Sequence, residues 1–435
     1  MRGVLREDGL VAWQKSDETP GLFTRLLDNR AVNVAFQPIV RIESGEVVAF
    51  EALARGPEGT ALESPAALFA AAEELGRTGE LDWVCQAVAL RAFLSAQLPR
   101  PVMLFNNMEP SAVGSPCPPD LMPDFEGADW SERRVVRELT ERSIVNDPAG
   151  LLRAVEHARR QSVGIALDDV GVTPASLAMM PLIRPDVIKL DLSLIHDQTT
   201  PAVAAVANAV LAQAERTGAA ILAEGIETEL HVSVARSLGA ELGQGWRYGR
   251  PGGLPVELAT PQHPIELLGA ITSDANTPFE AVKDRRVNRA PERQLNPMAM
   301  NLEHKVLSAG EPTVLLACFH SRRRFREVTQ HRYTHLATRT AFAAVVGRDV
   351  PADPAPGVRG AQLTDGDPIG DEWCVLVLGP HFAGALLAKL ASDGRSADDR
   401  IFDFVITFER DVVITAARPI LKRVLAANAN DKPQR

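Results

Sequence analysis

Residues 163–191 read VGIALDDVGVTPASLAMMPLIRPDVIKLD and contain one complete strand–helix–strand unit. An apolar strand over Val163–Asp169 ends in two adjacent carboxylates, a helix follows over Ala175–Leu182, and a second strand over Val187–Asp191 carries a lysine. Strands that alternate with helices in this way form parallel sheets, and functional polar groups gather at the carboxyl ends of such strands. The unit therefore predicts an α/β protein with a site at one end of its sheet.

The same alternation extends over residues 31–255. Eight strands are expected there: Asn33–Val40, Val47–Arg55, Val102–Asn107, Arg134–Glu141, Val163–Asp169, Val187–Asp191, Ala219–Gly225 and Glu241–Trp246. Helical patterns lie between most of them: Pro65–Leu75, Leu81–Leu98, Pro148–Gln161, Ala175–Leu182, Pro201–Thr217 and Glu229–Leu238. Eight such strands in about 225 residues match the size of a (β/α)8 barrel. Because the first connection, Arg41–Glu46, is too short for a helix, we expect a TIM-like barrel with one antiparallel strand.

Further regions are expected on both sides of the barrel. They are a polar lead-in (1–30), a proline-rich linker (256–294) with a short helix over Ile265–Ile271, a smaller α/β domain (295–427) and a polar tail (428–435). The smaller domain is predicted to contain the strands Val314–Phe319, Trp373–Leu378 and Phe404–Phe408. Its predicted helices are Arg322–Ala337, Phe382–Ala391 and Arg410–Leu425, with a short strand at Val412–Thr415 as an alternative start of the last one.

Polar side chains stand at or near the ends of seven of the eight predicted barrel strands. They are Glu51, Asn107, Glu138, Glu141, Asp168, Asp169, Lys189, Asp191, Glu224 and Gln244, and Glu227 follows close behind. A lone carboxylate at such a position is usually a helix cap or a surface charge, but capping does not require this clustering. Buried carboxylates need a partner or a metal. Carboxylate and amide oxygens without His or Cys favour Mg²⁺ or Mn²⁺ over zinc.

Two of these groups carry more specific information. The adjacent carboxylates Asp168 and Asp169 repel each other unless cations intervene, and one bridging carboxylate can hold two metal ions about 4 Å apart. For Lys189 the pattern leaves two roles open, a salt bridge to a neighbouring carboxylate or a part in the chemistry. The sequence thus favours a two-metal site over a purely structural cluster.

The composition excludes several classes of partner. The chain has 46 Lys+Arg against 56 Asp+Glu, a net charge of −10, which disfavours long nucleic acids and anionic membranes. The charged N-terminus lacks a signal-peptide pattern, and the apolar segment Pro201–Ala214 is too short to span a bilayer. Cys85, Cys117, Cys318 and Cys374 lie far apart, which indicates reduced thiols. We therefore expect a soluble, cytoplasmic protein.

Several short motifs in residues 31–252 occur in the order typical of one family. They are Phe36-Gln37-Pro38-Ile39, Phe50-Glu51-Ala52-Leu53-Ala54-Arg55, Asn107-Met108-Glu109-Pro110, Glu138-Leu139-Thr140-Glu141, Asp168-Asp169, Lys189-Leu190-Asp191, Ala223-Glu224-Gly225-Ile226-Glu227-Thr228 and Gln244-Gly245-Trp246. Together they resemble the EAL-domain cyclic di-GMP phosphodiesterases of bacterial second-messenger signalling. The fold of that family, a barrel with one antiparallel strand, agrees with the spacing of the strands.

This resemblance implies roles for single residues. The implied metal ligands are Glu51, Asn107, Glu138, Asp168, Asp169 and Glu224, with Asp168 bridging two Mg²⁺ or Mn²⁺ ions. Lys189 would hold or deprotonate the attacking water, and Glu227 and Gln244 would complete the water and metal network. Glu141 would brace the loop after the fifth strand, whereas Gln37 and Arg55 would contact the dinucleotide. The implied reaction is hydrolysis of one phosphodiester bond of cyclic di-GMP to linear pGpG.

One segment departs from the family pattern. Where the family has Phe-Gly-Thr-Gly-Tyr-Ser-Ser-Leu after the two aspartates, this chain has Val170–Leu177, with Thr173 for a glycine and Pro174 for the tyrosine. Thr disfavours a positive φ, and Pro fixes φ and removes a donor. We therefore expect reduced or tightly regulated activity. The alternative is a weak or inactive barrel that acts as a cyclic di-GMP receptor or a protein-interaction module. The family also implies a homodimer through the following segment, Leu177–Pro185.

The C-terminal region resembles the DICT sensory domain. The matching stretches are Phe319-His320-Ser321-Arg322, Phe342–Gly347, Trp373–Phe382 and Phe408-Glu409-Arg410-Asp411. The ligand or partner of this domain is unknown. Arg322–Arg326 is either an anion-binding segment or a solvated helix start, and the latter is the more common role of such a run. No diguanylate cyclase motif occurs, so synthesis of cyclic di-GMP is not indicated.

Overall fold

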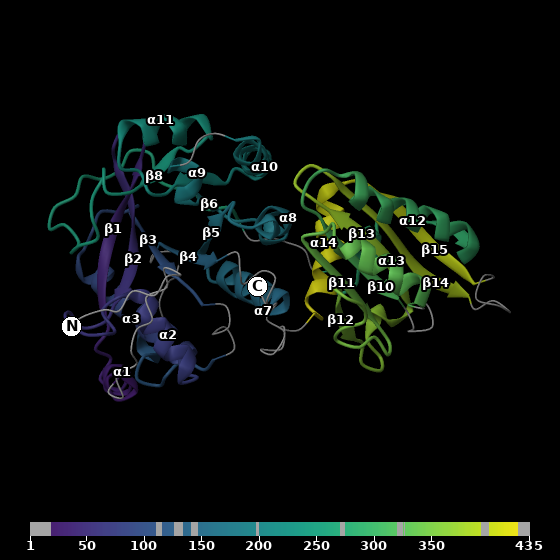
Figure 1. Cartoon of the computed structure of the whole chain (residues 1–435), viewed down its shortest axis with the longest axis horizontal. Coiled ribbons are helices and arrows are strands. Elements are labelled where there is room, and N and C mark those ends of the chain that lie inside the picture. Colours follow the sequence, from purple (N-terminus) through teal and green to yellow (C-terminus); the bar gives the residue numbers. More distant parts are fainter. Residues whose placement is uncertain are drawn as a thin grey trace, which may run out of the picture.

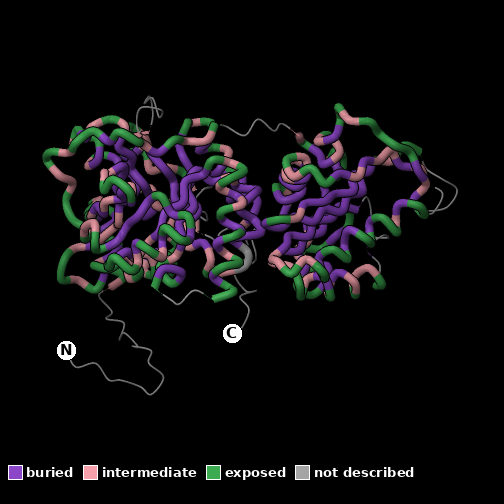
Figure 2. Tube along the Cα trace, turned by 90° about the horizontal axis from the view of Figure 1, so that it is seen from above, coloured by how far each residue is buried: buried purple, intermediate pink, exposed green. Residues whose placement is uncertain are grey.

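The structure is a computed structural model that describes residues 19–109, 115–125, 134–140, 147–196, 200–269, 275–319, 325, 327–392 and 400–424. Over these residues the strands form a closed barrel and a separate seven-stranded sheet, which lie side by side (Figure 1). Burial is concentrated along the strands of both parts, whereas the outer helices alternate between buried and exposed positions (Figure 2). The predicted order, a barrel followed by a smaller sheet-containing domain, is confirmed.

The barrel has the predicted topology. Its strands are β1 (Asn33–Arg41), β2 (Val47–Arg55), β3 (Met103–Asn107), β4 (Val135–Thr140), β5 (Gly164–Val170), β6 (Val187–Leu190), β7 (Ala220–Ala223) and β8 (Leu242–Gln244). Strand β1 is antiparallel to both β2 and β8, and the other neighbouring strands are parallel. The prediction of a TIM-like barrel with one antiparallel strand is therefore confirmed.

Helices surround the barrel, and capping residues fix where several of them begin. They are α2 (Pro65–Glu74), α3 (Thr78–Ser95), α4 (Met122–Phe125), α7 (Pro148–Arg160), α8 (Pro174–Ile183), α9 (Leu192–His196), α10 (Pro201–Thr217) and α11 (Glu229–Ser237). Ser64, Asp147 and Thr200 accept hydrogen bonds from first-turn amides of α2, α7 and α10, and a proline follows each cap. Such caps satisfy amides that have no partner inside the helix.

The barrel interior contains a layer of apolar side chains. Every strand contributes one buried residue to it: Ile39, Ala49, Phe105, Val136, Ala166, Val187, Leu222 and Leu242. Successive side chains of a strand point to opposite faces, so residues two positions apart share a face. The residues two positions nearer the mouth therefore also face the barrel axis, and their chemistry decides what the mouth can bind.

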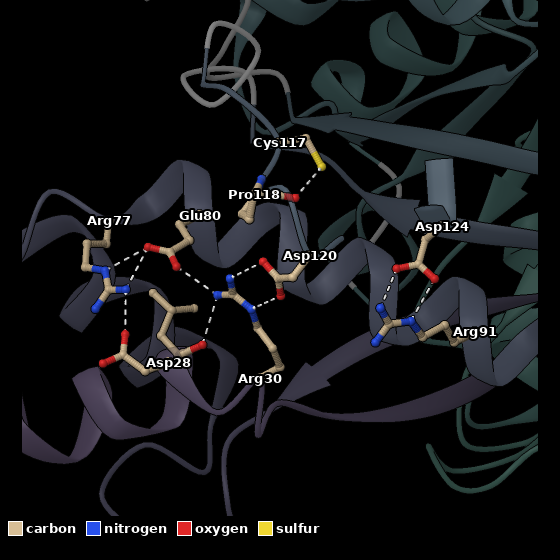
Figure 3. Close-up of polar contacts among 10 residues, drawn as sticks. Asp28, Arg30, Arg77, Glu80, Arg91, Cys117, Pro118, Asp120 and Asp124 are labelled. Carbon is tan, nitrogen blue, oxygen red and sulfur yellow. Dashed lines mark hydrogen bonds and ion pairs between the residues drawn. The ribbon is translucent and has the colours of Figure 1, made fainter. Parts of the chain in front are cut away.

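A helix occupies the end of the predicted lead-in. It is α1 (Thr19–Asp28), and it buries Phe23, Leu26 and Leu27. Arg30, which follows it, forms ion pairs with Glu80 and Asp120, and Arg77 joins Asp28 to Glu80 (Figure 3). Partly exposed ion pairs contribute at most about 1 kcal/mol each, so the apolar face of α1 provides most of its attachment.

The second domain is built on a mixed sheet with strand order β12-β11-β10-β13-β14-β15-β9. Its strands are β9 (Asn288–Pro291), β10 (Val314–Phe319), β11 (Phe342–Gly347), β12 (Arg359–Gln362), β13 (Glu372–Leu378), β14 (Ala383–Ser392) and β15 (Ile401–Thr407). Side chains of α12 (Glu292–Ser308) and α13 (Glu327–Ala337) join the apolar cluster on one face of the sheet. Those of the 3-10 helix η2 (Phe279–Val282) and of α14 (Arg410–Leu421) join the cluster on the other face.

The secondary structure predicted for this domain was wrong in several places. The segment predicted as a helix over Phe382–Ala391 is strand β14, which pairs with β13 on one side and β15 on the other. Its Ala and Leu content favours a helix, but two flanking strands outweigh that weak local preference. The predicted helix Arg410–Leu425 is confirmed as a helix over Arg410–Leu421, so its alternative of a strand at Val412–Thr415 is wrong. Residues 265–269 of the predicted linker helix are not helical. The linker also contains β9 and the start of α12.

Other expectations concern the whole chain. The described helices lack the length and apolar character that a bilayer span needs. All four cysteines are free thiols, as expected. The Arg322–Arg326 run and His320 lie outside the described residues, apart from Phe325. The predicted domain boundaries, at residues 30, 255, 294 and 427, stay predictions.

A buried ion pair holds the outer layer of the barrel together. Arg159 of α7 donates from Nη1 to both carboxylate oxygens of Asp186, which lies just before β6 and has no exposed surface. Asp186 also accepts the backbone amides of Ile165 and Leu268. One carboxylate thus joins a helix, two strand starts and the linker after the barrel.

We expect Asp186→Asn to lower the free energy of unfolding by about 3–5 kcal/mol, because it leaves the Arg159 charge buried without a counter-charge. Urea denaturation followed by tryptophan fluorescence measures this change. The matched control is Asp403→Asn, which removes the partner of the exposed Arg289 and should cost less than about 1 kcal/mol. Equal losses in the two variants would contradict the role given to Asp186.

Candidate metal centre at the barrel mouth

A polar layer lies directly above the apolar layer of the barrel. The residues two positions nearer the mouth on the eight strands are Gln37, Glu51, Asn107, Glu138, Asp168, Lys189, Glu224 and Gln244. All eight are residues that the sequence analysis predicted for the site. Each shares the inward face of its strand with an apolar residue below it. The layering explains how so many polar groups reach one place without disrupting the core.

Lys189 lies at the centre of this layer and has no exposed surface. Its Nζ is 2.8 Å from Glu138 Oε1, 2.9 Å from Glu224 Oε1 and 3.0 Å from Asp168 Oδ1. Glu51 Oε1 is farther away, at 3.6 Å. Burial alone would lower the pKa of the ammonium, but the surrounding carboxylates outweigh it and raise the pKa well above its usual value. Lys189 is therefore held as a buried ammonium that is ion-paired with several carboxylates.

The carboxylates around Lys189 are not fully neutralised by it. Burial, followed by repulsion from Glu51, raises the pKa of Glu138 well above its usual value. Burial is also the main cause that raises the pKa of Glu224 to about 8. For Glu51 burial acts in the same direction, but the charge of Lys189 and the Gln244 amide outweigh it, so its pKa is lowered. The cluster lacks positive charge, which a bound cation would supply.

The aspartate pair lies on an irregular part of β5. The pairing of β5 with β6 shifts register between Leu167 and Val170, and Asp169 has a φ of 57°. A bulge of this kind turns a side chain that would otherwise point outward, and Asp tolerates the left-handed region better than most residues. Oxygen atoms of Asp168, Asp169 and Glu224 lie within 4.8 Å of one another. This donor set fits a hard divalent cation such as Mg²⁺ or Mn²⁺.

Amide side chains connect the carboxylates to the rim. Gln244 Nε2 donates to Glu51 and, at 3.1 Å, to Gln37 Oε1. Asn107 Nδ2 donates to Glu51 Oε1 at 3.4 Å, which leaves its Oδ1 as an acceptor or a ligand atom. Gln37 Nε2 donates to the carbonyl of Gly249 at 3.0 Å. Gln37 is therefore fixed between the carboxylate cluster and the loop after β8.

Among the described residues, two predicted site residues, Arg55 and Glu227, have no such contact with the cluster. Arg55 is the last residue of β2, and its Nη1 donates to the neighbouring carbonyl of Ala54. Glu227 is exposed, and its backbone amide donates to His231 Nδ1 at 3.2 Å. Glu141 lies outside the described residues.

A buried carboxylate beneath the mouth was not predicted from the sequence. Asp82 of α3 is 4% exposed, and its Oδ1 accepts the backbone amide of Glu109 at 3.0 Å, two residues after Asn107. Burial raises the pKa of Asp82 to about 7, although the nearby Arg137 acts in the opposite direction. Asp82 thus fixes the chain that follows Asn107. The available signal was an aspartate, with Gln86 four residues later, inside a helix segment, Leu81–Leu90, whose other residues are apolar.

The rim beside Gln37 presents an aromatic platform whose function the sequence analysis did not predict. Trp246 is 54% exposed, and the Arg250 guanidinium lies 4.0 Å from the centre of the indole. Gly245 has a φ of 152°, and a Cβ there would lie 2.2 Å from the carbonyl oxygen of Ile226. Only glycine fits this close approach. The platform is therefore held by backbone packing, although its indole is open to solvent.

The segment that departs from the family pattern forms a regular helix start. Thr173 is extended, with φ −123° and ψ 149°, and it is the N-cap of α8, with Pro174 at the first helical position. Proline is favourable there because that amide has no partner in the helix. The structure needs no positive φ at Thr173, and the expectation of reduced or tightly regulated activity stays a prediction. The positive φ of this segment falls instead on Gly171, at 109°.

Comparison with known proteins gives matches over both parts of the chain. The profile described as "EAL domain" matches residues 23–251, and the one described as "Sensory domain in DIguanylate Cyclases and Two-component system" (DICT) matches residues 278–390. The cyclic di-GMP phosphodiesterase RocR of Pseudomonas aeruginosa is 29% identical over 235 residues, 52% of this chain and 59% of RocR. The probable cyclic di-GMP phosphodiesterase PdeB of Escherichia coli is 28% identical over 251 residues, 53% of this chain and 44% of PdeB.

The matched region is only part of each relative. An uncharacterized signaling protein of Caulobacter vibrioides is 30% identical over 243 residues, 54% of this chain but 29% of that protein. The chain thus spans less than two thirds of the length of these relatives. A manganese and cyclic di-GMP complex of BlrP1 from Klebsiella pneumoniae has a TM-score of 0.44 and 27% identity, covering 51% of this chain and 56% of BlrP1. Because the EAL profile matches more than half of the chain, the protein belongs to the EAL domain family, with a DICT domain after its barrel.

Proposed function

We propose that the barrel hydrolyses one phosphodiester bond of cyclic di-GMP to give linear pGpG, with Mg²⁺ or Mn²⁺ as cofactor. The observation that carries this proposal is the convergence of Asp168, Asp169 and Glu224 around the buried Lys189 at the barrel mouth. Relatives named as cyclic di-GMP phosphodiesterases support the substrate. Turnover of cyclic di-GMP distinguishes this enzyme from a receptor that only binds it.

In this proposal the polar layer holds two divalent ions. Glu51, Asn107, Glu138, Asp168, Asp169 and Glu224 are the proposed ligands, with Asp168 shared between the ions. Bound divalent ions lower the pKa of water and neutralise charge that develops on the phosphoryl oxygens. The carboxylates are already gathered, and their mutual repulsion in the absence of cations favours binding of the ions.

The other proposed roles belong to groups that handle water and substrate. Lys189, whose Nζ lies 3.0 Å from Asp168 Oδ1 and 2.9 Å from Glu224 Oε1, would hold or deprotonate the attacking water. Gln244 keeps Glu51 in place. Glu227 completes the water and metal network, and Glu141 braces the loop after β5. The roles of Glu227 and Glu141 rest on the family pattern. Gln37 and Arg55 bind the dinucleotide, Arg55 through a phosphate oxygen. The Trp246 platform offers one guanine a stacking surface beside Gln37.

Three expectations, on assembly, regulation and location, remain predictions. A homodimer through Leu177–Pro185 would need that segment to be exposed, but Leu177–Ile183 is buried within the single chain. Regulation by the DICT domain and a cytoplasmic location also stay proposals.

The first test is the reaction itself. Purified full-length protein with Mn²⁺ and cyclic di-GMP should produce pGpG, detected by chromatography, and Glu51→Ala should reduce the rate by roughly a hundredfold or more. Glu241→Ala is the control, because this exposed carboxylate pairs with Arg41 at the opposite end of the barrel. Binding of cyclic di-GMP without any pGpG would establish the receptor alternative. Full activity of Glu51→Ala would refute the proposed ligand set.

Arg55→Ala tests the phosphate contact. It should raise KM for cyclic di-GMP by roughly tenfold or more, because a charge-assisted hydrogen bond contributes about 1.5–3 kcal/mol. The affinity for Mn²⁺, measured by calorimetry without substrate, should stay unchanged, since Arg55 has no described contact with the carboxylates. A parallel loss of Mn²⁺ affinity would argue against a role confined to the phosphate.

Trp246→Ala tests the rim platform. Loss of one stacked base should weaken binding of cyclic di-GMP by about 1–3 kcal/mol, whereas Trp246→Phe keeps an aromatic face and should lose less. The measurements are KM and kcat for both variants. If alanine and phenylalanine have the same effect, or if only kcat changes, the indole does not stack on the substrate.

A further inference from the structure

Helix α14 lies between the two parts of the molecule. Its described side chains are buried on more than one side: Val413, Ala416, Ala417, Ile420 and Leu421 all have at most 1% exposure. One side packs on β10, β13 and β14 of its own sheet, and the other packs on α7 and α8 of the barrel (Figure 1). A single apolar cluster continues from the barrel helices through α14 into the sheet. The C-terminal domain therefore contacts the barrel through this helix, and Arg216 of α10 adds a hydrogen bond to the carbonyl of Pro380 at 2.8 Å.

A buried arginine gives this contact its polar part. Arg418 is 4% exposed, and its Nη1 donates to the carbonyl of Leu182 in the last turn of α8 at 2.9 Å. Its Nη2 donates to Glu156 of α7 at 3.1 Å, and Lys422 Nζ lies 2.7 Å from the same carboxylate. Carbonyls in the last turn of a helix have no partner inside the helix, so an outside donor fixes that end. Arg418 thus holds two barrel helices at once.

The opposite end of α8 leads into the candidate metal centre. The helix begins at Pro174, and only Gly171, Val172 and Thr173 separate it from the end of β5, which carries Asp168 and Asp169. The amide of Val172 also donates to the carbonyl of Asp169 at 3.3 Å. A displacement of the helix therefore acts directly on the bulge that orients both carboxylates.

The carboxyl end of α8 is held from two sides. On the barrel side, Arg159 Nη2 donates to the carbonyl of Arg184 at 2.7 Å, just after the helix. On the other side Arg418, from the C-terminal domain, donates to Leu182. The barrel supplies only one of these two arginines. Its helix α8 is fully anchored only when the C-terminal domain is seated.

We propose that Arg418 is a positioning residue for the metal centre, and that α14 is an intramolecular partner which holds α8 and, through it, the Asp168–Asp169 bulge. The consequence for metal binding and turnover rests on the proposed function. A ligand that shifts the C-terminal domain changes the affinity of the barrel for divalent ions, and bound ions change the affinity for that ligand by the same factor. The contact between α14 and α8 also covers this face of α8, so it is not open to a second copy of the chain.

The test compares full-length variants that differ in one contact of this region. Arg418→Ala removes both hydrogen bonds, Glu156→Ala removes the partner on α7, and Arg418→Lys keeps the charge but not the two-pronged geometry. The matched control is Arg423→Ala, because Arg423 follows the same helix but pairs with Asp367 inside the C-terminal domain, with contacts of 2.8 Å. Hydrogen–deuterium exchange over residues 164–183 and Mn²⁺ calorimetry without substrate are the two readouts.

We expect Arg418→Ala to increase exchange over residues 164–183, and to weaken Mn²⁺ binding, by roughly fivefold or more. Glu156→Ala should act in the same direction, and Arg418→Lys should recover part of the effect. Arg423→Ala should change neither quantity. The proposal is overturned if Arg418→Ala and Glu156→Ala leave exchange unchanged, or if Arg423→Ala has the same effect, which would indicate general loosening of α14. Exchange is read without substrate or metal, so an inactive wild-type protein would refute the proposed function and not this inference.

Discussion

The arrangement of the barrel mouth depends on the mutual repulsion of its carboxylates and on the groups that hold these carboxylates together. Five carboxyl groups, of Glu51, Glu138, Asp168, Asp169 and Glu224, surround or adjoin the single ammonium of Lys189. Such a group of like charges persists inside a protein only where a rigid frame holds it. The apolar layer below and the amides of Gln244 and Asn107 supply that frame. The acidic residues behind the net charge of −10 thus include a cluster at one end of the barrel.

The barrel and its polar layer could be predicted because both follow from local periodicity. Parallel strands buried on both faces are continuous apolar runs, and a polar residue at the end of such a run is conspicuous. The hairpin of β1 and β2 followed from a connection too short for a helix. The bulge at Asp169 could not be predicted, because nothing local distinguishes a regular strand end from one whose register shifts against its neighbour.

Contacts between distant segments account for what the sequence did not reveal. Asp82 meets Glu109, and Arg418 meets Leu182, only after the strands have been arranged around the barrel. Segment 383–392 illustrates the same limit, since its local preference for a helix is overridden by β13 and β15. At Thr173 the backbone is extended and a threonine suits it, which the preference of the residue alone did not reveal.

The linker after the barrel limits how the C-terminal domain can move relative to the barrel. Leu268 is bound through its amide to Asp186 and through its carbonyl to Arg159, on the same side of the barrel where α14 is seated. The C-terminal domain is thus attached both by its covalent connection and by a helix that returns to the barrel. Arg216 of α10 adds a further contact, a hydrogen bond to the carbonyl of Pro380 at 2.8 Å. The domain is thus held at several points rather than on a flexible tether, and a stimulus received by it would reach the barrel through these contacts.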